Sequence, residues 1–78
     1  MIHELKVWPE EYQLLQIGKK EFEIRKNDRN FQVGDSINLR EWNPKTALYT
    51  GRWMVRRITY IIQGKFGLPD DICVMQLR

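Results

Sequence analysis

Three charged residues whose side chains could act together lie in one short segment of the chain. They are Lys20, Glu23 and Arg25, and they follow Gly18 in the stretch Gly-Lys-Lys-Glu-Phe-Glu-Ile-Arg. In an extended strand Glu23 and Arg25 project from one face and the apolar residues between them from the other. Because clustered charges usually form an ion-pair network or a site, this group is the first candidate for function.

The first chemistry that this group suggests is binding of a nucleic acid or a nucleotide. Lys20 and Arg25 could neutralise phosphates, and Arg25 offers a planar fork that grips a phosphate or a base edge. Glu23 could hold Arg25 in place or accept a hydrogen bond from a base amino group. Further cations extend the positive field, and they are Lys19, Lys26, Arg29, Arg56 and Arg57.

Aromatic residues in or near the predicted loops could stack on unpaired bases. They are Trp42, Tyr49, Trp53 and Phe66. Each stacked base is worth roughly 1–3 kcal/mol, and Trp42 is the aromatic residue that we include in the ligand-binding set. In so small a domain most aromatic side chains belong to the core, so we expect most of these four to be structural.

The second chemistry is catalysis. If burial disfavours the charged form of Lys20, this residue could act as a general base, with Glu23 or Asp71 activating water. A hydroxyl nucleophile would come from Thr50 or Thr59, and nothing in the sequence places either near Lys20. The simplest alternative gives the charged residues a structural role, as ion pairs that brace neighbouring strands.

Metal and cofactor chemistry is not expected. His3 and Cys73 are the only residues of their types, whereas a structural zinc site needs about four such ligands. Cys73 lies in an apolar segment and is expected to be buried. The chain contains neither a P-loop nor a dinucleotide-binding fingerprint.

Length and composition predict one domain that spans residues 1–78. The net charge is +3, a mild excess that is compatible with polyanion binding. A single cysteine fits a reducing cytosol, and no segment is apolar and long enough for a signal peptide or a membrane span. We therefore expect a cytoplasmic protein without a membrane partner.

The pattern along the chain predicts five strands and one short helix. The helix begins at Pro9, with Glu10 and Glu11 in its first turn, and ends at Gly18. We expect strands at residues 2–8, 21–26, 36–41, 52–62 and 72–77. A long hairpin connection is expected at residues 42–51, and the pair Arg56-Arg57 suggests a bulge. So many short strands indicate a mainly β protein of the α+β class, whose curved sheet closes into a small barrel.

The spacing of the charged segment resembles a known family. Gly18, Lys20, Glu23 and Arg25 match the G-x-K-x-x-E-x-R motif of the ASCH domains (activating signal cointegrator homology), members of the PUA-like superfamily. Further similarities are Val33-Gly34-Asp35, Trp8-Pro9, Lys26-Asn27-Asp28 and Leu39-Arg40-Glu41-Trp42, which resemble a short bacterial and phage branch of unknown function. The resemblance implies a PUA-like β-barrel with a cleft beside the motif.

The resemblance also implies a function. Family members are proposed to bind RNA, so we expect an RNA-binding or nucleotide-binding module that uses Lys19, Lys20, Glu23, Arg25, Lys26, Arg56 and Trp42. Some branches resemble small amidohydrolases that act on acylated cytidine, and an enzyme of that kind would use Lys20 and Glu23. Those branches carry a threonine where this chain has Glu23. A third alternative is a protein-interaction module that presents Trp42 and Trp53.

Overall fold

The computed structural model describes all of residues 1–78. The elements in chain order are β1 (Ile2–Val7), α1 (Pro9–Gln16), β2 (Phe22–Lys26), β3 (Ser36–Asn43), β4 (Leu48–Gln63) and β5 (Ile72–Leu77). The prediction of a mainly β fold with five strands and one short N-terminal helix is confirmed. No helix is long and apolar enough to cross a lipid bilayer.

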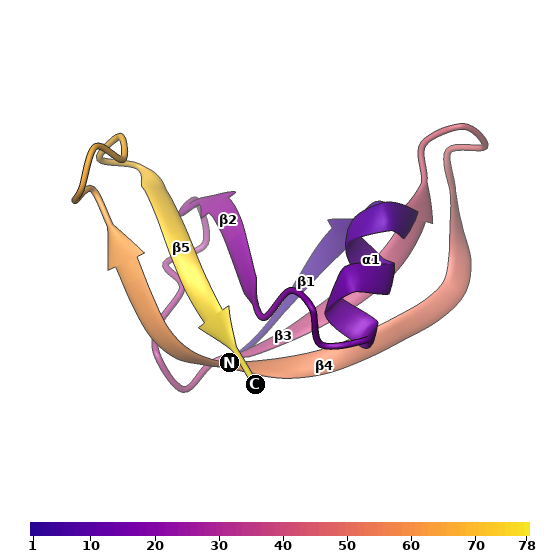
Figure 1. Cartoon of the computed structure of the whole chain (residues 1–78), viewed down its shortest axis with the longest axis horizontal. Coiled ribbons are helices and arrows are strands. Elements are labelled where there is room, and N and C mark those ends of the chain that lie inside the picture. Colours follow the sequence, from indigo (N-terminus) through magenta and orange to yellow (C-terminus); the bar gives the residue numbers. More distant parts are fainter.

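The strands form one mixed sheet in the order β1-β3-β4-β5-β2. The β1–β3 pair is parallel and the other three pairs are antiparallel. Figure 1 shows the sheet bent into a U, with α1 and β2 inside it. The two edge strands, β1 and β2, share no backbone ladder, so the predicted closed barrel is wrong and the sheet is open.

Arginine side chains span the gap between the two edge strands, which we call the seam. Arg25 donates through Nη2 to the Lys6 carbonyl oxygen at 2.6 Å. Arg29 donates through Nη1 to the Glu4 carbonyl oxygen. Edge carbonyls need a partner when they face the protein, and here side chains supply it in place of a neighbouring strand. The two edges of the sheet are thus joined by side-chain hydrogen bonds and not by a backbone ladder.

The connection between β3 and β4 is much shorter than predicted. Trp42 pairs with Tyr49 and Asn43 with Leu48, so β4 begins at Leu48 and only four residues, 44–47, remain as the turn. Gly51 has a positive φ of 94° and lies within β4, not in a turn. The pairing shifts between Arg40 and Trp42, which lets the hairpin continue past this glycine.

The predicted bulge at Arg56-Arg57 is also wrong. Both residues continue a regular ladder with β3, in which Arg56 is opposite Ile37 and Arg57 is opposite Ser36. The shift in β4 comes slightly later, between Ile58 and Tyr60, where pairing passes from β3 to β5. The two arginines point to opposite faces, as successive strand residues do.

The core lies between the concave side of the sheet and the apolar face of α1. Tyr12 and Leu15 are the buried residues of the helix, and Gly18 ends it with a φ of 80°. Cys73 is buried, as its apolar segment predicts, and so are Met54 and Met75. The core residues together are Leu5, Val7, Tyr12, Leu15, Phe31, Ile37, Leu39, Met54, Ile58, Cys73, Met75 and Leu77.

Candidate functional site

The charged face of β2 points into the protein, and its apolar face points out. Glu23 is only 4% exposed, whereas Phe22 and Ile24 are exposed. A carboxylate is buried at this level only when cations or hydrogen-bond donors satisfy it. The position of Glu23 therefore requires partners, and both come from the same short segment.

Glu23 binds a cation at each of its oxygens. Lys20 Nζ donates to Oε1 at 3.1 Å, and Arg25 Nε donates to Oε2 at 3.0 Å. Lys20 Nζ also donates to Glu11 Oε2 at 2.8 Å, which links the segment before β2 to the helix. The structure thus brings Lys20, Glu23 and Arg25 together, as the motif predicts, and adds Glu11 to them.

The pKa of Lys20 is raised above its ordinary value of 10.5. Partial burial works to lower the pKa, but the hydrogen bond to Glu11 and the charge of Glu23 outweigh it. The sequence suggested the opposite direction, namely burial that disfavours the charged form. The carboxylates decide the sign, and Glu11 reaches Lys20 because the chain folds back on α1, where the Lys20 backbone N–H donates to the Leu14 carbonyl.

A cavity of about 340 Å³ opens at the seam beside this cluster. It lies between the end of β1, the start of α1 and the strand β2. Trp8 lines it and is 56% exposed. The charged side chains at the cavity are Glu11, Lys20, Glu23 and Arg25, two cations and two carboxylates. Lys6 also borders the cavity, but its ammonium lies over the Trp42 ring. We call this space the seam cavity.

Other predicted ligand-binding residues lie away from the seam cavity. Lys19 is exposed and belongs to no ion pair, and Lys26 is exposed with its Nζ 3.9 Å from Asp71 Oδ2. Arg56 lines a second cavity of about 320 Å³ near the end of α1, and Lys20 lines this cavity too. Trp42 lies on the outer face of the sheet, where the Lys6 ammonium sits 4.8 Å from its ring centroid.

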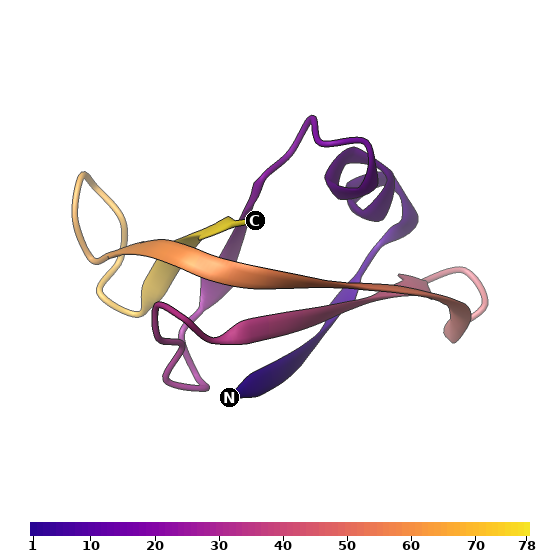
Figure 2. The ribbon, with the colours of Figure 1, turned by 90° about the horizontal axis from the view of Figure 1, so that it is seen from below.

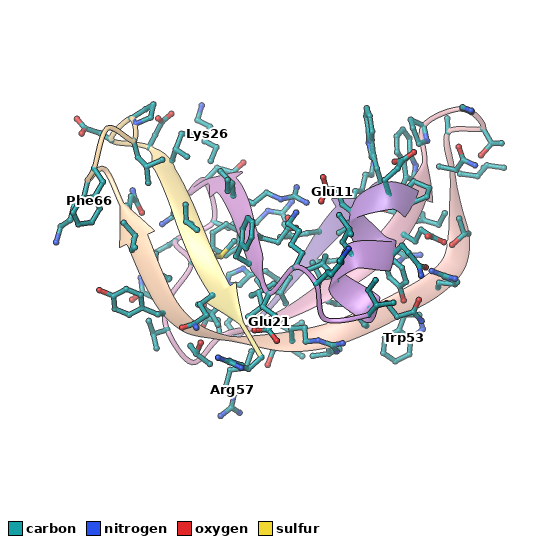
Figure 3. The ribbon with its side chains drawn as sticks, in the orientation of Figure 1. Glu11, Glu21, Lys26, Trp53, Arg57 and Phe66 are labelled. Carbon is teal, nitrogen blue, oxygen red and sulfur yellow. The ribbon has the colours of Figure 1, made fainter.

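The expectation that most of the four aromatic residues are structural is wrong. None is buried: Trp53 is 63% exposed and Phe66 88%, Tyr49 is exposed, and Trp42 is half-buried. Figure 3 shows Phe66 projecting from the loop between β4 and β5, and Trp53 on the side of β4 away from α1. The sheet has a single covering helix, so one of its faces has nothing to bury aromatics against.

A second buried carboxylate, Glu41, serves the packing of α1. It accepts a hydrogen bond from Thr50 Oγ1 at 2.7 Å and lies 3.3 Å from Arg52 Nε. The Arg52 guanidinium stacks 4.7 Å from the ring centroid of Tyr12 in the helix. Thr59 donates to the Gln76 backbone carbonyl on β5. The two candidate hydroxyls thus bind other groups, and neither lines the seam cavity.

His3 and Cys73 lie apart from the seam cluster. His3 Nε2 is 2.8 Å from Asp35 Oδ2, and the His3 ring packs edge-on against Phe31. This hydrogen bond holds the pKa of Asp35 below its ordinary value. Burial raises the pKa of the Cys73 thiol. No three His, Cys, Asp or Glu side chains gather where they could hold a metal ion.

Sequence reasoning missed three residues of the seam cavity. Lys6, Trp8 and Glu11 come from the end of β1 and the start of α1, far from the motif in the chain. The sequence signal at this place is Pro9, which marks the change from strand to helix but says nothing of what the junction faces. Only the packing of α1 against the sheet shows that this junction faces β2.

Comparison with known proteins gives a family and one relative. Residues 2–77 match the family model described as "Domain of unknown function (DUF3850)". A protein of Escherichia phage P2, described as "Uncharacterized 12.9 kDa protein in GpA 3'region", is 43% identical over 76 residues. The alignment covers 97% of this chain and 68% of the phage protein. The ASCH resemblance is not part of either match and stays a prediction.

Proposed function

The chain belongs to the DUF3850 family, and we propose that it binds RNA or a nucleotide in the seam cavity. The observation that carries the proposal is the pairing of two cations on one buried carboxylate beside an exposed indole. The buried carboxylate of Glu23 accepts a hydrogen bond from Lys20 and one from Arg25, and Trp8 lines the same cavity. Charged donors and a stacking surface within one hollow are what a phosphorylated nucleoside requires.

The two cations keep donors for a ligand. An ammonium has three N–H donors and a guanidinium five. Lys20 uses two on Glu11 and Glu23, so one remains. Arg25 uses two on Glu23 and the Lys6 carbonyl, so three remain. A phosphate has enough oxygens to accept from both residues, and such charge-assisted bonds are the strong class.

Trp8 supports a base beside that phosphate. Its exposed indole offers a face on which any base can stack. The cavity volume of about 340 Å³ falls in the range of small-molecule sites. One nucleotide, with its base on Trp8 and its phosphate at Lys20 and Arg25, fits this arrangement. Glu11 has a half-exposed side chain and could accept from a base amino group.

The amidohydrolase alternative gains no support from the site. A general base at neutral pH needs a pKa near the working pH, and the raised pKa of Lys20 keeps it protonated. Both oxygens of Glu23 already accept from cations. A protonated lysine, and a carboxylate with a cation at each oxygen, suit ion binding better than proton abstraction.

We also propose that the DUF3850 family is related to the ASCH domains. Glu23 and Arg25 lie in β2 and Lys20 in the segment before it, all beside one cavity, and a short helix precedes them, in line with the resemblance in sequence. The open seam is the departure from the barrel that this relationship implies. A solved structure of a DUF3850 protein that superposed poorly on ASCH domains would remove this part of the proposal.

The experiment is a binding titration by calorimetry and NMR shift mapping with cytidine and adenosine monophosphates, then short RNAs. We expect Trp8→Ala and Arg25→Gln each to weaken binding about tenfold or more. Lys65→Gln is the matched control, because Lys65 is an exposed loop residue outside every ion pair. Trp8 is exposed, so its substitution tests the site with the fold intact. Equal affinity of wild type and Trp8→Ala, or no binding at all, would refute the proposal.

A further inference from the structure

The outer face of β1, β3 and β4 is uncovered and rich in aromatic residues. Along β4, Met54 and Ile58 are buried on the inner side, so Trp53 and Arg57 project from the outer side. Figure 2 looks onto this convex side and shows β4 with no element in front of it. Figure 3 shows Trp53 and Arg57 on the side of β4 opposite to Glu11. The strands thus present a bare, curved surface.

Aromatic and cationic side chains alternate on this surface. Arg40 is opposite Trp53, and Trp42 is opposite Tyr49 in the same ladder. The Arg40 guanidinium stacks 3.7 Å from the Tyr49 ring centroid, and Lys6 Nζ lies 4.8 Å from that of Trp42. Trp53 has no cation over its ring and is 63% exposed. We call this surface the outer platform, and its residues are Lys6, Arg40, Trp42, Tyr49, Trp53 and Arg57.

The charge of the outer platform decides what can cover it. It carries three cations, and Glu4 is the one carboxylate on the same face of the three strands, bound to Arg40 at 2.9 Å. The net charge is therefore three minus one, or +2. A second copy docked through the same face would bring the same charge against it, and an apolar partner would leave Arg57 without an anion. A polyanion with stackable rings meets both demands.

We propose that a single strand of RNA runs from the seam cavity across the edge of β1 onto the outer platform. This inference rests on the proposed function, because it extends the bound nucleotide by its neighbours in the chain. Lys6 connects the two places: its backbone carbonyl lies at the seam, where Arg25 donates to it, and its ammonium lies over the Trp42 ring on the outer platform. One nucleotide occupies the cavity, and the following bases stack on the aromatic rings and on the Arg40 plane.

The arrangement selects unpaired RNA. Bases in a duplex are stacked on each other and offer no free face to Trp53, whereas a single strand can splay its bases onto a sheet. Stacking accepts any base, so we expect weak sequence preference on the platform and a marked preference for single over double strands. Arg57 has no ion-pair partner in the protein and is free to contact a phosphate.

The test compares two probes and two matched variants. The probes are cytidine monophosphate, which can fill only the seam cavity, and a single-stranded RNA of about eight nucleotides, within the range of known single-strand sites. The variants are Trp53→Ala and the control Tyr60→Ala, because both rings stand on the outside of β4 and are about equally exposed, at 63% and 58%. Affinities are measured by fluorescence anisotropy and calorimetry at several salt concentrations.

We expect Trp53→Ala to bind the RNA about tenfold more weakly and the mononucleotide as tightly as wild type. Tyr60→Ala should match wild type with both probes. An Arg57→Gln variant should lower the slope of log K against log salt by about 0.7, the value for one phosphate contact on a single strand. A duplex of the same sequence should bind more weakly than the single strand.

The outcomes separate the two proposals. If the mononucleotide binds and the RNA binds Trp53→Ala and wild type equally, the proposal of RNA binding on the outer platform is refuted. The proposed nucleotide site in the seam cavity is then retained. If neither probe binds wild type, both proposals fail. If Trp53→Ala instead converts a dimer to a monomer without changing RNA affinity, the platform is an interface between copies and our inference is wrong.

Discussion

Arg25 Nη2 lies 2.6 Å from the backbone carbonyl oxygen of Lys6, across the gap between β2 and β1. The same guanidinium donates through Nε to Glu23 on its own strand. One side chain therefore joins the two edges of the sheet and borders the seam cavity. Lysine would keep the charge but could not make both bonds in this geometry.

Replacement of Arg25 by lysine should lower the free energy of unfolding by about 1–2 kcal/mol, because charge-assisted hydrogen bonds across the seam are lost. Arg25 is partly exposed, which keeps the effect at this modest level. Urea denaturation at neutral pH measures it. Arg57→Lys is the control, since Arg57 is exposed and outside every ion pair, and it should change stability by less than about 0.5 kcal/mol. Equal losses in the two variants would mean that Arg25 does not hold the seam.

Replacement of Glu23 by glutamine should cost about 1–3 kcal/mol, because two cations lose the buried anion between them. Glu21→Gln changes a neighbouring glutamate with an exposed pair to Arg78 and should cost less than about 1 kcal/mol. Thermal and urea unfolding of both variants would measure this difference. A Glu23→Gln protein as stable as wild type would show that the cluster does not brace the fold.

The stability contributed by Lys20 should disappear in alkali. Its pKa in the folded protein is above 10.5, so its charged form contributes fully below pH 10.5, and this contribution is lost as pH rises through the folded pKa. We expect the stability difference between wild type and Lys20→Met to shrink above pH 10.5. Lys65→Met, as a control, should show no such trend. Denaturation curves from about pH 8 to about pH 12 test this, and a difference that stayed constant would contradict it.

The hydrogen bond between His3 and Asp35 should affect the stability of the protein at acidic pH. The hydrogen bond from His3 is the main reason that the pKa of Asp35 is lowered, with help from the Gln32 amide and the N-terminal ammonium. A carboxyl group with a lowered pKa stabilises the folded protein above pH 3.8. This contribution is lost as the pH falls through the pKa that Asp35 has in the folded protein.

Asp35→Asn should therefore be less stable than wild type at neutral pH and approach it as the pH drops below 3.8. Acid denaturation followed by circular dichroism measures the two curves. Asp28→Asn is a suitable control because that carboxylate is exposed and its one ion pair, with Arg29, is long at 3.9 Å. Parallel acid curves for wild type and Asp35→Asn would contradict the assignment.

Local patterns allowed much of the fold to be predicted. The bounds of β5 match residues 72–77, and Pro9 and Gly18 mark the start and end region of the helix. These features depend on neighbours in the chain: alternation, proline at the first helical position and glycine in a left-handed conformation. The cluster of Lys20, Glu23 and Arg25 was predictable for the same reason, since its members share one strand and its entry.

Contacts between distant segments were not predictable in this way. Closure of the sheet depends on whether β1 meets β2, and side chains of Arg25 and Arg29 fill that gap instead. The direction of the Lys20 pKa shift depends on Glu11, which Lys20 meets only when the chain after α1 folds back on the helix. The exposure of Trp53 depends on the absence of a second layer on the convex face, a feature that no local pattern encodes.

The long strand β4 pairs with β3 along its first part and with β5 along its second. It is the one strand that belongs to both arms of the U, whereas β1 and β2 each have a single neighbour. If either arm unfolds, β4 loses the hydrogen bonds along about half of its length. We therefore expect the two arms to unfold together, as one cooperative unit. Amide protons at the centre of β4 should thus exchange with deuterium more slowly than those of the two edge strands. We expect local unfolding to begin at the seam, where these edge strands lie.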